Sequence, residues 1–112
     1  MRRRIEEGVP LGFTFESFAW DERKRTRNIA KHRVDFTYAK RVFEGSVFGL
    51  REMDGGEERW IVIGLIDGRE FAVAFVESNG LCRIISARRA ARHEREAFYE
   101  GVGQGGKPAR RR

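Results

Sequence analysis

The chain has 112 residues, and its 23 lysines and arginines exceed its 17 aspartates and glutamates, giving a formal net charge of +6 at pH 7. These numbers fit one domain with a real core and favour a polyanionic partner, with nucleic acid first among the candidates. The single cysteine excludes an internal disulfide, and no apolar run approaches the roughly 18 residues that span a membrane, so we expect a protein of the cytoplasm.

The N-terminal third contains one strongly polar predicted helix. Residues 1–12 show no hydrophobic period and predict a flexible extension before a single domain over residues 13–101. Alternation over Phe13–Trp20 indicates a first strand. Asp21 is a plausible N-cap for a helix over Glu22–His32, which starts acidic and ends basic as the helix dipole favours. Four polar residues share one face of this helix, so the face is either solvated or directed at a ligand: Lys24, Arg27, Asn28 and Lys31.

The middle of the chain predicts a short helix and then a series of strands. Asp35 can cap a helix over Phe36–Glu44, and Gly45 is placed to end it. The apolar run Arg59–Ile66 predicts a central strand buried on both faces. With turns between them, the predicted strands form an antiparallel meander of four, or five with Phe13–Trp20: Val47–Met53, Arg59–Ile66, Arg69–Glu77 and Leu81–Ala87.

The segment Cys82–Tyr99 combines a strand with an arginine-rich helix. Ser86 is a plausible N-cap, which would start the helix at Ala87. Helical spacing would then place an apolar seam with one carboxylate, Glu94, beside a row of polar side chains: Arg88, Arg92, Arg95 and Tyr99. Residues 102–112 are rich in glycine and arginine and predict a disordered basic tail.

Three segments together resemble the BrnT family of bacterial toxins, the ribonuclease half of type II toxin–antitoxin modules. They are Phe18–Lys24 (FAWDERK) followed by Asn28, Lys31 and His32; Arg59–Gly64 (RWIVIG); and Ile84–Ala90 (IISARRA) followed by Glu94, Arg95 and Tyr99. The resemblance implies an α+β, RelE-like fold, in which the meander packs against N-terminal helices and a C-terminal helix. It also implies metal-independent RNA cleavage and neutralisation by a BrnA-like antitoxin, whose ribbon-helix-helix domain binds DNA. The family commonly has glycine after the Lys-His pair, where this chain has Arg33.

Metal-independent cleavage of RNA needs a base, an acid and cations around the phosphate, and the sequence offers candidates for each. His32 titrates nearest to neutral pH, although a histidine in a last helical turn can also serve only the helix dipole. Arg88 can clamp the phosphate, unless it belongs to a solvated arginine run. Glu94 either orients an arginine or transfers a proton, and we favour orientation. The candidate catalytic residues are His32, Arg88, Arg59, Lys31 and Glu94, and the candidate substrate-binding residues are Lys24, Arg92, Arg95 and Tyr99.

For several candidates a purely structural role stays open, and so does a rival function of the whole protein. Arg59 could be only a surface residue at a strand end, Arg95 could pair with nearby acids, and Tyr99 could belong to the core. The sequence lacks a CxxC, an HExxH or a glycine-rich phosphate loop, so we expect neither a metal nor a cofactor. The rival function is a non-catalytic basic module that binds RNA or acts as a co-repressor only together with a DNA-binding partner.

Overall fold

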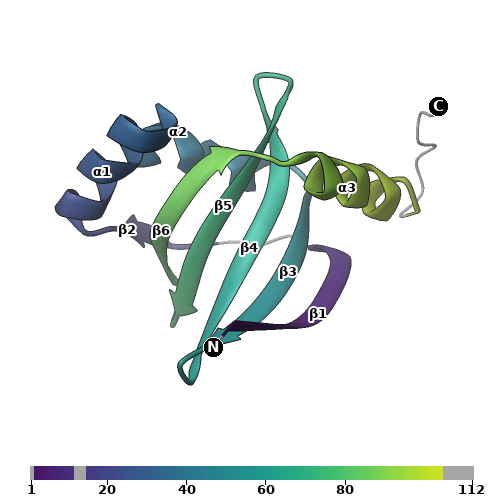
Figure 1. Cartoon of the computed structure of the whole chain (residues 1–112), viewed down its shortest axis with the longest axis horizontal. Coiled ribbons are helices and arrows are strands. Elements are labelled where there is room, and N and C mark those ends of the chain that lie inside the picture. The colour runs from purple at the N-terminus through teal and green to yellow at the C-terminus, as the bar shows by residue number, and fades with distance from the viewer. Residues whose placement is uncertain (1, 12–14, 105–112) are drawn as a thin grey trace.

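The computed structural model describes residues 2–11 and 15–104 and has a six-stranded mixed sheet with helices at its two sides (Figure 1). The strand order is β1-β3-β4-β5-β6-β2. The elements in chain order are β1 (Arg2–Leu11), β2 (Ser17–Ala19), α1 (Glu22–His32), α2 (Phe36–Ala39), the 3-10 helix η1 (Lys40–Glu44), β3 (Val47–Asp54), β4 (Glu57–Ile66), β5 (Arg69–Ser78), β6 (Leu81–Arg89) and α3 (Arg92–Gln104).

The α+β class and the antiparallel meander are confirmed. Strands β3 to β6 pair antiparallel with their neighbours, and the predicted extra strand is the short β2, which runs parallel to β6. Within the described ranges, no helix is long and apolar enough to cross a membrane.

Residues 2–11 differ from the prediction of a flexible extension, because they form strand β1 at the edge of the sheet, antiparallel to β3. The register of this pairing shifts between Arg4 and Glu6 and again between Glu7 and Val9. Each shift breaks the two-residue alternation by which a strand is recognised in a sequence. Pro10 is tolerated because an edge strand needs ladder hydrogen bonds on one side only.

Helix α1 has the predicted bounds and the predicted cap. The Asp21 carboxylate accepts hydrogen bonds from the backbone N–H groups of Arg23 at 2.8 Å and Lys24 at 3.4 Å. The helix ends at Arg33, whose φ of 62° is left-handed, and the Arg33 N–H donates to the carbonyl of Ile29. Arginine therefore occupies a conformation that glycine adopts more easily, at a cost of roughly 1 kcal/mol.

The second predicted helix is divided into two parts. Asp35 caps α2 by accepting from the Thr37 N–H, and the chain then tightens into η1 up to Glu44. Such 3-10 turns are common at the ends of α-helices. Gly45 is extended, with a φ of −123°, so it does not supply the left-handed residue that the sequence pattern predicts.

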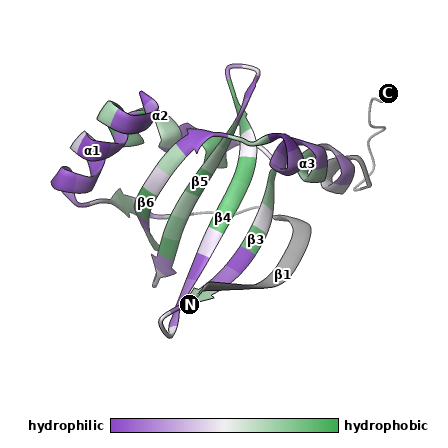
Figure 2. Cartoon of the chain, viewed as in Figure 1, coloured by the Kyte–Doolittle hydropathy of each residue, from purple (hydrophilic) through white to green (hydrophobic). Residues whose placement is uncertain are grey.

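The central strand β4 is buried on both faces, as predicted, because the sheet carries an apolar core on each side. Val62 packs in the core under α2 and η1, together with Phe36, and Ile63 packs in the core under α3, together with Phe98. Figure 2 shows the apolar strands between helices that are mostly hydrophilic.

The predicted start of the C-terminal helix is wrong. Ser86 lies within β6, where it pairs with Ala74, and the strand continues through Arg88 and Arg89. Helix α3 begins only at Arg92, so Arg88 does not belong to the predicted row of helical arginines. Pairing with β5 satisfies the backbone of this segment and overrides the local helix signals. Of the predicted basic tail, residues 102–104 lie in α3, and residues 105–112 lie outside the described part of the chain.

Candidate functional site

Asn28 joins α1 to the edge of β6. Strand β2 pairs with β6 only between Leu81 and Arg83, and α1 packs against the strand farther along. There Asn28, which is only 6% exposed, hydrogen-bonds to β6 through its side chain as the backbone of a neighbouring strand would. Its Nδ2 donates to the carbonyl of Ala87 at 2.8 Å, and its Oδ1 accepts from the Ala87 N–H at 3.1 Å. The same Nδ2 donates to the carbonyl of Val34 at 2.9 Å, which fixes the turn after the helix.

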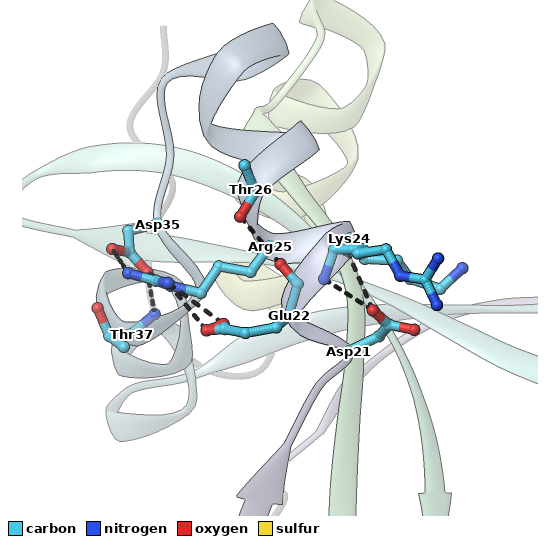
Figure 3. A network of polar contacts seen from close by, with 8 residues as sticks. Asp21, Glu22, Lys24, Arg25, Thr26, Asp35 and Thr37 are labelled. Carbon is cyan, nitrogen blue, oxygen red and sulfur yellow. Dashed lines mark hydrogen bonds and ion pairs between the residues drawn. The ribbon is translucent and has the colours of Figure 1, made fainter.

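A second set of contacts fixes the segment that follows His32 (Figure 3). The Arg25 guanidinium donates to both carboxylate oxygens of Asp35, at 2.9 and 3.0 Å, and also contacts Glu22. The hydrogen bond from Arg25 holds the pKa of Asp35 well below its usual range. The cap of α2 is thus tied to the exposed side of α1, and His32 lies at the end of a helix that is held on two sides.

An open pocket of about 300 Å³ lies between α1 and β6. One wall consists of α1 side chains and the other of two residues of β6. The lining residues are Lys24, Arg27, Asn28, Lys31, His32, Ile85 and Ser86. The predicted residues Lys24, Lys31 and His32 are therefore brought together, and the pocket is strongly basic.

The pKa of His32 lies below 6.5, first because the imidazole is partly buried and then because of the positive charges of Lys31 and Arg88. Arg88 thus acts electrostatically on His32 although the two residues are 56 positions apart. A depressed pKa keeps the imidazole neutral at pH 7 and able to accept a proton.

Glu94 holds the end of the Arg88 guanidinium. Arg88 Nη1 and Nη2 donate to the two carboxylate oxygens of Glu94 at 2.8 and 2.9 Å, and Nη1 also donates to the carbonyl of Arg89 at 3.3 Å. An arginine has five N–H groups, so within the described residues the Nε–H and one Nη2–H of Arg88 are left over. The Arg88 side chain is 36% exposed, and that of Glu94 is 4% exposed.

The Glu94 carboxylate stays ionised despite its burial. Burial alone would raise its pKa, but the hydrogen bonds from Arg88 and from the Ala91 N–H and the charge of Arg88 lower the pKa overall. The bond from Ala91, at 2.8 Å, also caps the first turn of α3. An ionised carboxylate with both oxygens occupied orients an arginine better than it transfers a proton.

A β-bulge in β6 directs the side chains around the pocket. Phe75 pairs with Ile84 and Ala74 pairs with Ser86, so Ile85 is an extra residue in the strand. Beyond the bulge the two faces exchange, and Ala87 enters the same core as Ile84. Arg88 consequently falls on the opposite face, where Glu94 meets it.

The remaining candidates lie apart from the pocket. Arg92 pairs with Glu96, Arg95 donates to the carbonyl of Ala90, and the Tyr99 hydroxyl donates to Glu70.

Arg59 lies at the start of β4, where it forms ion pairs with Asp54 and Glu57 at 3.3 and 3.5 Å. In the sheet, Ile63 pairs with Ala72, and Ala72 pairs with Arg88. Arg59 lies four residues before Ile63 in β4, so about 13 Å of strand separates Arg59 from the level of Arg88.

Sequence reasoning placed Asn28 on the basic face of the helix but gave it no role. The only local signal is the residue type, because an amide carries a donor nitrogen beside an acceptor oxygen and can pair with both the carbonyl and the N–H of one residue. In the described part of the chain, no three histidine, cysteine or acidic side chains are grouped so that they could hold a metal ion.

A family model described as the ribonuclease toxin BrnT of type II toxin–antitoxin systems matches residues 20–94. The match spans α1, the meander and the start of α3, and it contains both His32 and Arg88. It confirms the resemblance that the three sequence segments carry. No curated protein matches the chain.

Proposed function

Because the chain belongs to the BrnT family of ribonuclease toxins of type II toxin–antitoxin systems, we propose that it is an endoribonuclease that cleaves RNA without a metal ion and thereby inhibits translation. The observation that carries this proposal is that His32 lines a basic pocket and lies near enough to Arg88, which Glu94 anchors, for the charge of Arg88 to lower the His32 pKa. Their combination supplies a proton acceptor and a fixed positive charge, the two things that RNA cleavage requires first.

His32 is the base in the proposed reaction. It accepts the proton of a ribose 2′-hydroxyl, the 2′-oxygen bonds to the adjacent phosphorus, and the bond from phosphorus to the 5′-oxygen breaks. Lys31, which lines the same pocket, gives a proton to the leaving oxygen. The products are a 2′,3′-cyclic phosphate and a 5′-hydroxyl, so no water molecule is consumed.

Arg88 binds the phosphate in this mechanism, and Glu94 positions it. Two N–H groups of Arg88, on Nε and Nη2, point along one edge of the guanidinium and can bind two phosphate oxygens side by side. The pairing with Glu94 fixes the orientation of that edge before substrate arrives. Preorganised charge of this kind replaces the stabilisation that a metal ion would give to the transition state.

The proposal is tested with the purified full chain and a single-stranded RNA in the presence of a chelator. We expect cleavage with cyclic-phosphate ends for the wild type and a loss of at least 100-fold for His32→Ala and Arg88→Ala. Arg83→Ala, which removes an exposed arginine from the other end of β6, is the control that retains activity. RNA that is bound but left intact by folded wild-type protein would instead support the non-catalytic basic module.

The partners proposed are RNA and a BrnA-like antitoxin that binds DNA through a ribbon-helix-helix domain, all within the cytoplasm. The net charge of +6 and the basic pocket support a polyanionic substrate. We expect the open reading frame beside the gene to encode the antitoxin. Its co-expression should restore the growth that the wild-type chain arrests, and growth that stays arrested would contradict this assignment.

A further inference from the structure

The pocket between α1 and β6 has two chemically different walls. On the α1 side, Lys24, Arg27 and Lys31 follow each other at helical spacing over about 10 Å of the helix axis. On the β6 side, the bulge contributes two half-buried residues, the apolar Ile85 and the hydroxyl-bearing Ser86. A wall of cations opposite an apolar and hydroxylated wall suits a ligand with an anionic backbone and a flat, partly apolar group.

The three cations are available to a ligand. Among the residues that the structure describes, Lys24, Arg27 and Lys31 form no ion pair, whereas Arg25, Arg41 and Arg51 each pair with a carboxylate. Asn28, in contrast, is not available, because both polar atoms of its amide are engaged with backbone groups. Direct polar contacts from the β6 wall would therefore come from Ser86.

The size of the pocket limits what can enter it. At about 300 Å³ it is at the lower end of the volumes of ligand pockets, enough for one nucleotide. A base in a duplex is paired and stacked, and it would have to leave the helix to enter. A single strand exposes its bases without that cost.

We propose that this pocket binds one unpaired nucleotide of single-stranded RNA, with its base against Ile85 and Ser86 and the neighbouring phosphates along Lys24 and Arg27. This inference deepens the proposed function and rests on it for the choice of RNA. The nucleotide lies beside His32, which lines the same pocket, so the pocket selects unpaired sites for cleavage.

Binding is measured with a fully 2′-O-methylated RNA, which cannot be cleaved through its 2′-oxygen, as a single strand and as a duplex. We expect the full chain to bind the single strand at least 10-fold more tightly. Ile85→Trp fills the pocket without changing charge and should weaken single-strand binding at least 10-fold. Lys24→Gln combined with Arg27→Gln should weaken this binding and reduce the slope of its affinity against salt concentration by the amount expected for about two phosphate contacts.

Arg83→Gln removes one positive charge outside the pocket and should leave the affinity unchanged within about twofold, and thermal unfolding shows whether each variant is folded. Equal binding of strand and duplex, or a folded Ile85→Trp variant that binds like the wild type, would overturn the inference. Cleavage of unmodified RNA separates the two proposals. If only the pocket is wrong, Ile85→Trp cleaves like the wild type; if only the nuclease is wrong, the binding pattern holds without any cleavage.

Discussion

Replacement of Asn28 by alanine tests whether this amide holds α1 against β6. The substitution removes three hydrogen bonds, two to Ala87 and one to Val34, from a residue that is 6% exposed. At ~1 kcal/mol for each bond, the free energy of unfolding should fall by about 3 kcal/mol. The backbone groups that remain buried without partners make this a lower estimate.

Replacement of Asn28 by aspartate keeps the shape but reverses the chemistry. A carboxylate would face the carbonyl oxygens of Ala87 and Val34, to which Nδ2 now donates. Both repulsion and burial would raise the pKa of the new carboxyl in the folded state. The difference in stability from the wild type should therefore be larger at pH 7 than at pH 5, where protonation relieves the repulsion.

Urea unfolding followed by tryptophan fluorescence measures these changes, because Trp20 and Trp60 pack against the core under α2 and η1. Thr26→Ala is the matched control on the same helix, since its exposed hydroxyl donates only to the carbonyl of Glu22. It should cost less than about 1 kcal/mol. An equally small loss for Asn28→Ala would refute the role assigned to this amide.

Three further predictions follow from the titrating groups. Glu94→Gln should cost roughly 1–3 kcal/mol, because it removes the charge from a buried partner of the half-exposed Arg88. The pKa of Glu94 is lowered on folding from 4.5, so the stabilisation by its carboxylate is complete above that value and is lost as the pH falls below it. In urea unfolding at stepped pH, the free energy of unfolding of the variant should therefore fall less at acid pH than that of the wild type. In a nuclear magnetic resonance titration His32 should have a pKa below 6.5, and Arg88→Gln should raise it, whereas an unchanged value would contradict their proximity. Cys82 is fully buried with its pKa raised to about 12, so iodoacetamide should modify it only in the unfolded chain, and rapid labelling of the native protein would refute its burial.

The features that could be predicted from the sequence are those with a local cause. Helix α1 has its predicted bounds because Asp21 caps it and because no glycine or proline interrupts it. The turn predicted between the strands that became β4 and β5 forms at Asp67 and Gly68, an Asp-Gly pair typical of two-residue hairpins, and both residues adopt positive φ. Strand β1 could not be predicted, because its register shifts remove the alternation that would reveal it.

The candidate site depends mostly on contacts between distant segments, which local patterns do not contain. The bond between Asn28 and Ala87 joins residues 59 positions apart, and only the packing of α1 on β6 creates it. Arg59 is a predicted site residue that the same kind of long-range contact places apart from the pocket. Its position at the start of the central strand was predicted, but the register of the sheet decides that it lies among acidic residues, far along β4 from the level of Arg88.

The bulge at Ile85 explains why the helix does not start at Ser86, as predicted, and why the Arg88 side chain meets Glu94. In a regular strand Arg88 would share a face with Ile84 and would enter the apolar core beneath α2, where a guanidinium has no partner. One extra residue exchanges the faces, so that Ala87 fills the core and Arg88 meets Glu94. The same carboxylate then caps α3, which is why the helix begins after the strand has placed Arg88 and not at Ser86.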